Sequence, residues 1–330
     1  MRQRFQEAAV LKILCDNARS QNAKLRLNAV WALKHFVQGV DNEMKRQCLE
    51  ELGQGWLVQL ICDDKENDAL GTSITNSDRG LEYGEDTNED VQMDQFEEQV
   101  DAAFGHACSR PSSGRSKSVQ QAELRIAALR DEETNPLKKA RKDDVAVQEQ
   151  GLDFIRNLIG GAGQGGSETT DMIDFLFQSL GQDRVFEILI SKLKNKVVNP
   201  YIRRSSTSST QPETKILPPQ AEIIIAVVHI LIHMAASIPR HRQLVIAQTE
   251  LLKLLVPQFN HTNKDVRLAL CWLCMNLTWL DDATDGPACK ARTAELRRLG
   301  FLTKLEMLDQ DTELDVRERA KTASWQMKAQ

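Results

Sequence analysis

Two pairs of residues in this chain have the spacing of chemically active sites. Cys271 and Cys274 form a Cys-x-x-Cys motif, which in other settings carries thiol redox chemistry or supplies half of a zinc site. His229 and His233 lie four residues apart, so that on a helix both imidazoles would share one face and could bind a metal ion. The histidine pair has neither an adjacent glutamate nor a third ligand in the motif, and no second Cys-x-x-Cys exists.

The surroundings of the two cysteines favour a structural role. Both lie in the apolar stretch 265–277, where a buried cysteine behaves as a small hydrophobic side chain. No Ser-His-Asp set, glycine-rich nucleotide loop or paired-carboxylate motif stands out elsewhere. We therefore expect a protein that is not an enzyme and that uses no metal and no cofactor. Because catalytic geometry is spatial, an active site assembled from distant residues stays open as an alternative.

A third pair, Trp272 and Asn276, indicates binding rather than catalysis. The two residues are one helical turn apart and would share one face, with Trp279 close behind them. Either this face binds a partner, or Trp272 packs between neighbouring helices, since a tryptophan at helical spacing is commonly part of a core.

The stretch around this pair recurs along the chain. Val266 follows Ile223 by 43 residues, which is the unit length of armadillo and HEAT-type helical repeats. The recurring segments, of which the third is the most divergent, are 24–36, 146–158, 222–234, 265–277 and 315–327. Their first apolar column is Leu25, Val147, Ile223, Val266 and Val316.

A glycine marks the end of a helix in three of the blocks that lie between these segments. Gly53, Gly181 and Gly300 are each followed by an apolar run at helical spacing. A short helix ending in glycine, a second apolar helix and a third helix built on the recurring segment is the order of an armadillo repeat, and the chain resembles that family. The resemblance implies an all-α, right-handed superhelical solenoid, in which each unit buries its apolar face against its neighbours.

The composition agrees with a helical protein that binds other proteins. Hydrophobic residues make up 41% of the chain but aromatic residues only 5%, and the net charge of -5 gives no basic footprint for nucleic acid or an anionic membrane. The most apolar stretch, 221–238, is too short to span a membrane and is bracketed by prolines, so we expect a buried helix. Seven scattered cysteines and a charged N-terminal stretch without a signal peptide predict a cytoplasmic or nuclear location.

The sequence predicts two insertions between the repeats. Residues 63–98 hold 13 acidic and two basic residues, too much charge for a packed core, so we expect a disordered acidic insertion. A second segment, rich in Ser, Thr and Pro, is expected to be a loop, and residues 1–15 have the pattern of the tail of an earlier repeat. The predicted parts are 1–63 (armadillo repeats, the first incomplete), 64–117 (acidic insertion), 118–194 (armadillo repeats), 195–218 (loop) and 219–330 (C-terminal armadillo repeats).

Several longer motifs resemble one armadillo family more closely. They are VQEQGLDFIRNLI with the following GQDRVFEILISKL, DVRLALCWLCMNLTW, and LRRLGFLTKLEMLDQDTELDVRERAKTA. These are similar to the C-terminal half of the armadillo-repeat scaffold subunits of GID/CTLH ubiquitin ligase complexes. That resemblance implies a non-catalytic scaffold or adaptor for ubiquitin-dependent protein degradation. It would dock a substrate receptor in a concave groove and bind no nucleic acid, membrane or small-molecule substrate.

The armadillo resemblance also implies that the third helix of each unit lines the groove. There an indole can wall a pocket, and an amide can bond the backbone of a bound peptide. An alternative is an importin-α-like receptor for peptides or nuclear localisation signals, but that function needs successive Trp/Asn pairs, and only one copy has both residues. The predicted partner-binding residues are Trp31, His35, Asp153, Asn157, His229, His233, Trp272, Asn276 and Trp279, and the last copy has Thr322 and Gln326 in the paired columns.

Overall fold

The computed structural model describes residues 2–62, 136–160, 166–198 and 215–330. Contacts divide the chain into one unit made of residues 1–72 and 143–330 and a second of residues 73–142, most of which lies outside the described residues. The predicted acidic insertion at 64–117 also lies outside them. All contacts discussed below belong to the first unit.

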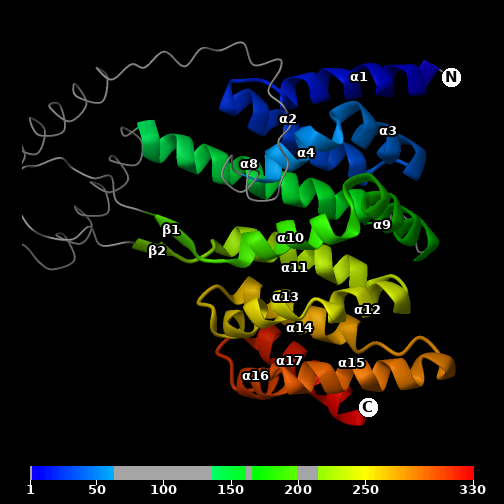
Figure 1. Cartoon of the computed structure of the whole chain (residues 1–330), viewed down its shortest axis with the longest axis vertical. Coiled ribbons are helices and arrows are strands. Elements are labelled where there is room, and N and C mark those ends of the chain that lie inside the picture. The colour runs from blue at the N-terminus through cyan, green and yellow to red at the C-terminus, as the bar shows by residue number, and fades with distance from the viewer. Residues whose placement is uncertain (1, 63–135, 161–165, 199–214) are drawn as a thin grey trace, which may run out of the picture. The chain divides into compact units, whose positions relative to one another are not determined.

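Within this unit, the helices follow one another in groups of three (Figure 1). Each complete group has a first helix, a second helix and a third helix that is the longest of the three. This is the order that the recurring segments predict. An incomplete group, α1 (Arg2–Ala18) and α2 (Ala23–Gln38), comes first. The complete groups are α3 (Asn42–Leu52), α4 (Gln54–Ile61) and α8 (Pro136–Ile159); α9 (Gly166–Leu180), α10 (Gln182–Leu193) and α11 (Ala221–Ala236); α12 (Pro239–Ala247), α13 (Thr249–Leu255) and α14 (Lys264–Leu277); and α15 (Gly286–Arg298), α16 (Phe301–Leu308) and α17 (Leu314–Ala329).

Short 3-10 turns accompany the last two groups. The turn η1 (Val256–Asn260) continues α13 toward α14, and η2 (Ala283–Asp285) leads into α15. Asn263 caps α14 by accepting a hydrogen bond from the backbone N–H of Asp265 at 2.8 Å, which satisfies a donor that the first turn leaves unpaired.

The three predicted glycines stand between a first and a second helix, which confirms their role. Gly53, Gly181 and Gly300 have φ of 81°, 85° and 93°, a region that strains any residue with a Cβ atom. The backbone N–H of Gly53 bonds to the carbonyl of Leu49, and its own carbonyl accepts from Leu57. The chain therefore ends one helix and starts the next within a single residue.

The third helices carry the predicted core columns. Val147, Ile223, Val266 and Val316 are all buried. Leu25, in the same column, differs from these four because its side chain is 43% exposed. Leu25 lies in the first turn of α2, which belongs to the incomplete group, and among the described residues no other helix fully covers it.

The all-α fold class is confirmed, with one short two-stranded ribbon beside the helices. The strands β1 (Lys196–Val198) and β2 (Lys215–Leu217) pair antiparallel, with Val197 opposite Ile216. The predicted loop 195–218 is therefore wrong at its two ends, while its middle lies outside the described residues. The strands hold β-branched residues, which favour extended backbone, and their pairing satisfies backbone groups that a loop would leave to water.

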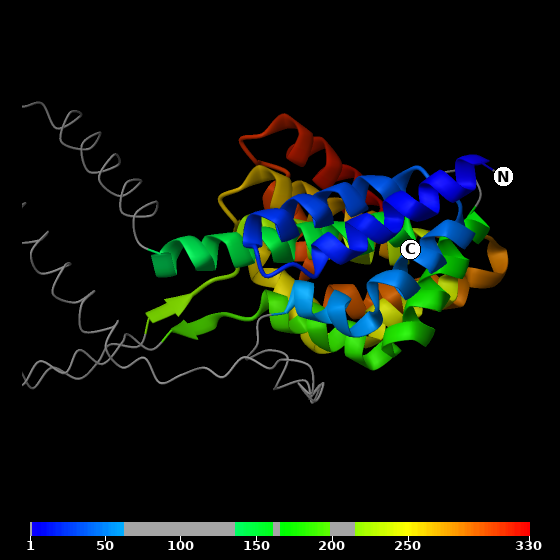
Figure 2. The same cartoon turned by 90° about the horizontal axis from the view of Figure 1, so that it is seen from above.

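The most apolar helix is buried within the stack. In α11, the side chains on nearly every face are in the core, and the helix packs against α10, α12 and α14. Figure 2 shows this unit from above, so that its successive helices, coloured from blue to red along the chain, overlap in the view. In the part of the chain that the structure describes, no helix is long and apolar enough to cross a membrane.

Candidate protein-docking face

Eight of the nine predicted partner-binding residues lie on the third helices α2, α8, α11 and α14, and Trp279 follows α14 directly. We call the side of the third helices that carries these residues, and its continuation on α17, the third-helix face. At its start, α2 and α8 are tied by two polar contacts. The Lys34 ammonium lies 3.2 Å from the Asp153 carboxylate, and the Asn157 side-chain amide donates to the Lys34 carbonyl at 2.9 Å. Asp153 and Asn157 thus connect neighbouring units, in addition to any contact with a partner.

The next step of the face joins α8 to α11 through Arg156. Its guanidinium lies 3.2 Å from Asp153 and 3.4 Å from Nδ1 of His229. Burial and the nearby Arg156 charge lower the pKa of His229, and they lower the pKa of His233 to about 4. Both imidazoles are therefore neutral at physiological pH. Across the described ranges, no group of three or more His, Cys, Asp and Glu side chains could hold a metal ion.

Trp31 and His35 form an exposed aromatic pair on α2. Their ring centres are 4.5 Å apart and the rings are inclined at 63°, an edge-to-face contact. Trp31 is 54% exposed, so one side of the indole rests on the imidazole while the rest faces solvent. This pair can pack against an apolar or cationic side chain of a partner.

On α14, the Trp272 side chain is partly exposed on the third-helix face and partly covered by a neighbouring helix. The side chain is 39% exposed, and the Arg319 guanidinium of α17 lies 3.7 Å from its ring centre. The Asn276 side chain donates to the Trp272 carbonyl of its own helix at 2.9 Å. One N–H of this amide is therefore already bonded within α14, while its second N–H and its oxygen remain available to a partner backbone.

Gln326 repeats at the end of the face the contact that Asn157 makes at its start. Its amide donates to the Met275 carbonyl at 2.8 Å and to the Thr278 hydroxyl at 3.0 Å. Asn157 and Gln326 occupy the same column of the recurring segment, and in both cases the acceptor carbonyl belongs to the column before it, in the preceding third helix. An amide in this column therefore fastens one third helix to the next.

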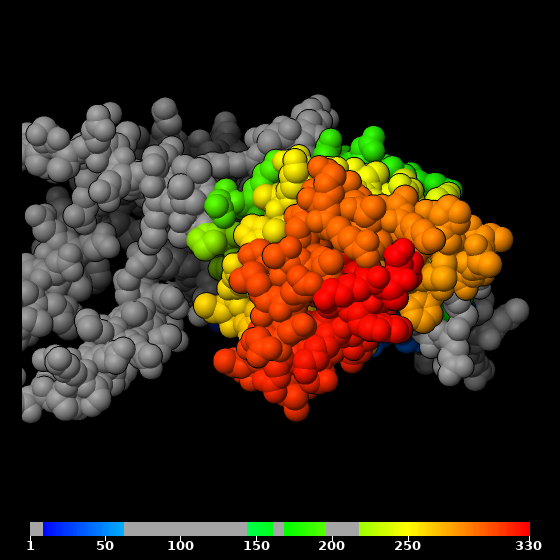
Figure 3. Space-filling view, turned by 90° about the horizontal axis from the view of Figure 1, so that it is seen from below, coloured from blue at the N-terminus to red at the C-terminus, as the bar shows by residue number. Residues whose placement is uncertain are grey.

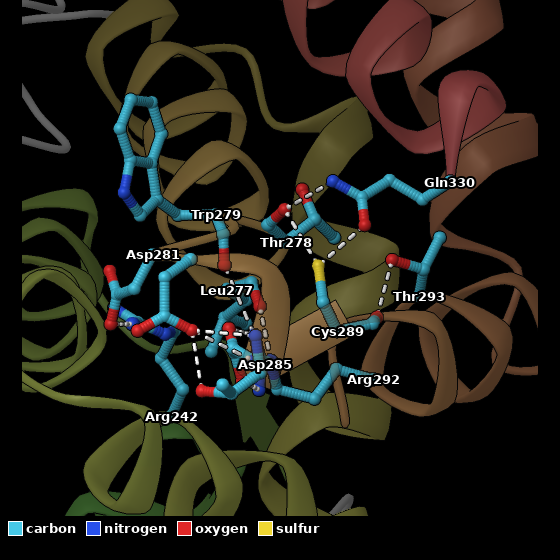
Figure 4. A network of polar contacts seen from close by, with 12 residues as sticks. Arg242, Leu277, Thr278, Trp279, Asp281, Asp285, Cys289, Arg292, Thr293 and Gln330 are labelled. Atoms are coloured by element: carbon cyan, nitrogen blue, oxygen red, sulfur yellow. Dashed lines mark hydrogen bonds and ion pairs between the residues drawn. The ribbon is translucent and has the colours of Figure 1, made fainter. Parts of the chain in front are cut away.

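Trp279 follows α14 on a loop whose backbone accepts a hydrogen bond from a buried arginine (Figure 4). Arg292 is buried and donates to the carbonyls of Leu277 and Trp279, at 3.0 Å each, while it pairs with Asp285 at 2.7 Å. The Arg292 hydrogen bonds lower the pKa of Asp285, which keeps that carboxylate charged. The Trp279 side chain is 54% exposed and points away from this network in Figure 4.

A second buried arginine supports the same loop from α12. Arg242 donates to the Ala235 carbonyl at 2.8 Å and forms an ion pair with Asp281. Sequence reasoning missed both arginines. The only signal was a charged residue at an apolar position of a helix, and such residues are usually exposed.

The two cysteines of the Cys-x-x-Cys motif are packed, as expected. Cys271 and Cys274 are fully buried within α14, and burial raises the pKa of Cys271 to about 12. Burial likewise raises the pKa of Cys274. Both groups are therefore thiols rather than thiolates at neutral pH, and the thiolate is the reactive form in redox and metal chemistry.

The structure brings together one polar set that the sequence did not reveal. His241 lies 3.0 Å from Asp174 through Nε2 and 3.1 Å from the Ser237 hydroxyl through Nδ1, and that hydroxyl is 2.8 Å from Thr170. The residue types are those of a hydrolase triad. However, the imidazole is buried, and the serine hydroxyl already contacts both His241 and Thr170. We interpret the set as a polar link between α9 and the start of α12.

These features define a helical-repeat protein of the armadillo class. The assignment rests on the order of the helices, the glycine junctions and the contacts between successive third helices. The helical repeats of this chain are consistent with a non-enzymatic, protein-binding role. A designed armadillo repeat protein covers 96% of this chain and 99% of its own, at 15% identity and a TM-score of 0.41. An engineered protein covers 97% and 99%, at 14% identity and a TM-score of 0.45.

The sequence has weak homology to a curated protein that is named as a subunit of a complex. It is 26% identical to GID complex subunit 5 of Schizosaccharomyces pombe over 284 residues, which cover 68% of this chain. The chain spans 32% of the length of that relative. No protein-family model matches the chain.

Proposed function

We propose that this chain is a non-catalytic scaffold of a GID-type ubiquitin ligase and that its third-helix face docks the substrate receptor. Support comes from the homology to GID complex subunit 5 and from the exposed aromatic side chains of this face. In this role the chain holds a receptor and its substrate near the catalytic subunits, which lie on other chains. We also propose a cytoplasmic or nuclear location, to be tested by imaging a tagged chain.

The observation that carries the docking proposal is the end of α14. Trp272 and Trp279 are 39% and 54% exposed, while the other side of the same helix, with Leu270 and Leu277, is fully buried. Two buried arginines hold the loop that carries Trp279, so the backbone that presents the indole loses little freedom when a partner binds. Partly exposed tryptophans are frequent hot spots of protein interfaces.

The experiment is a binding measurement with the purified substrate-receptor subunit of a GID-type ligase. Trp279→Ala should weaken binding by about tenfold or more, because a hot-spot tryptophan commonly contributes about 2 kcal/mol or more. Asn276→Ala should weaken it less, since one of its donors already bonds the Trp272 carbonyl. Both variants should keep the wild-type melting temperature, because neither side chain is part of the core.

A matched control is Ile13→Ala, which truncates an exposed apolar side chain on α1, away from α14. It should bind the receptor like the wild type. Absence of receptor binding by the wild-type chain would overturn the scaffold proposal, and full affinity in a folded Trp279→Ala variant would move the docking site off the end of α14.

A further inference from the structure

The side of α17 that faces away from the core carries an unusual stripe of four residues. A helix turns by about 100° per residue, so Leu314, Glu318, Lys321 and Trp325 fall within about 60° of arc. Leu314 is 60% exposed and Trp325 is 71% exposed, and the side chains of the charged pair are 60% and 51% exposed. We call these four residues the α17 stripe. Figure 3 shows α17, in red, at the surface of this end of the unit.

The preceding third helices show what covers this side of a third helix. Where α17 has Glu318, Lys321 and Trp325, the aligned columns of α14 and α11 hold apolar side chains that are buried or half-buried, and the next third helix packs against each of these two helices. These side chains are Leu268, Cys271 and Met275 in α14, and Ile225, Val228 and Ile232 in α11. The α17 stripe therefore corresponds to the surface through which α11 contacts α14 and α14 contacts α17.

We propose that the α17 stripe binds the α17 stripe of a second copy of this chain, in an antiparallel arrangement about a two-fold axis. The chemistry of the stripe is symmetric about its centre, because Leu314 and Trp325 have the same midpoint as Glu318 and Lys321. Antiparallel pairing thus places each Trp325 against the Leu314 of the other copy and each Glu318 against the other copy's Lys321. A two-fold interface needs this self-complementary pattern.

The same pattern argues that the stripe is more than a solvated helix surface. The ion pair between Glu318 and Lys321, 3.0 Å apart within one helix, lies in the middle, and one large apolar side chain lies at each side of it. A helix side that faced only water would carry polar residues at all these positions. Two apolar contacts and a central network of four charges form a small interface, so the dimer depends on protein concentration.

Exchanging the charges of Glu318 and Lys321 tests whether the stripe binds a second copy of the chain and whether the two helices are antiparallel. In sedimentation experiments on the full chain, Glu318→Lys alone and Lys321→Glu alone each set like charges opposite one another and should weaken the dimer by about tenfold or more. The double exchange should recover it. An equal mixture of the two single variants should also associate, because one copy then has only positive charges in the stripe and the other only negative ones.

The mixture separates contacts between copies from effects inside one helix, since the pair within the helix is broken in both variants. Trp325→Ala should weaken the dimer by about tenfold or more, whereas Ile13→Ala, which truncates another exposed apolar residue, should not change it. Circular dichroism checks that each variant is folded. A wild-type chain that stays monomeric up to about 0.5 mM would overturn the proposal, as would single variants that dimerise like the wild type or a mixture that fails to associate.

Discussion

The guanidinium of Arg319 in α17 lies 3.7 Å from the ring centre of Trp272 in α14. One face of this indole is therefore already covered by a cation from the next unit, and the 39% of the side chain that remains exposed is what a partner can reach. Trp272 thus combines the two roles that its position in the sequence left open: it links two repeats and it contributes to the third-helix face.

This contact predicts a measurable coupling between the two residues. Arg319→Ala should lower the free energy of unfolding by about 0.5–2 kcal/mol, the usual range for a cation over an aromatic ring. In a double-mutant cycle with Trp272→Ala, the two effects should be less than additive by about 0.5–1 kcal/mol. Urea denaturation of the four proteins gives the coupling energy.

A core variant provides the scale for that measurement. Leu270 is fully buried in the same helix, and Leu270→Ala should cost about 2–5 kcal/mol. It should show no coupling to Arg319→Ala if the cycle reports a direct contact. Strict additivity of the Trp272 and Arg319 substitutions would show that the contact contributes nothing to stability.

The buried pair of Arg292 and Asp285 should be among the most sensitive sites of the last repeat. Arg292→Ala leaves a buried carboxylate without its counter-ion and removes donors from the carbonyls of Leu277 and Trp279, so a cost of about 3–5 kcal/mol is expected. Because the pKa of Asp285 is lowered in the folded state, its contribution is present above the unfolded pKa of about 4 and is lost as the pH falls through the folded value.

Chemical denaturation at neutral pH measures this effect. Replacing both partners, as in Arg292→Met with Asp285→Leu, removes the buried charges together and should cost less than Arg292→Ala alone. A double variant that is as unstable as the single one would instead make the hydrogen bonds to the two carbonyls the main contribution.

His233 should make stability depend on pH in the mildly acidic range. Its pKa is lowered from 6.5 to about 4 by burial and by the Arg156 charge, so the unfolded chain binds a proton that the folded chain does not. Its contribution to stability is therefore complete above pH 6.5 and decreases as the pH falls toward 4. Between pH 7 and pH 5 this amounts to about 1–2 kcal/mol.

Unfolding experiments at pH 7 and pH 5 with His233→Gln test that dependence. The variant should lose less stability than the wild type on acidification, and the wild-type imidazole should titrate near pH 4 in NMR spectra. An equal loss in both proteins would assign the pH dependence to other groups, of which His229, also lowered in pKa, is the nearest candidate.

Much of the fold could be predicted because its information is local and repeated. The recurring segments identified all five third helices, and the glycines at 53, 181 and 300 identified three helix junctions, since only a residue without a Cβ atom adopts positive φ at low cost. The sequence also assigned Cys271 and Cys274 to the core, because their apolar neighbours outweighed the motif. The strands β1 and β2 were missed, since each has only three residues, too few for a β-strand pattern to be distinguished from a loop.

The candidate site depended on contacts between residues far apart in the chain. The sequence by itself determined the repeat, its period and the column that holds Trp272 and Asn276. Only the tertiary structure decided that Asn276 bonds its own helix, whereas Asn157 and Gln326, in the same column, bond the helix before theirs. A column fixes the direction of a side chain relative to its helix axis, but the hydrogen-bond partner depends on which backbone carbonyl the neighbouring helix brings within about 3 Å, and that distance is set by packing across the whole stack.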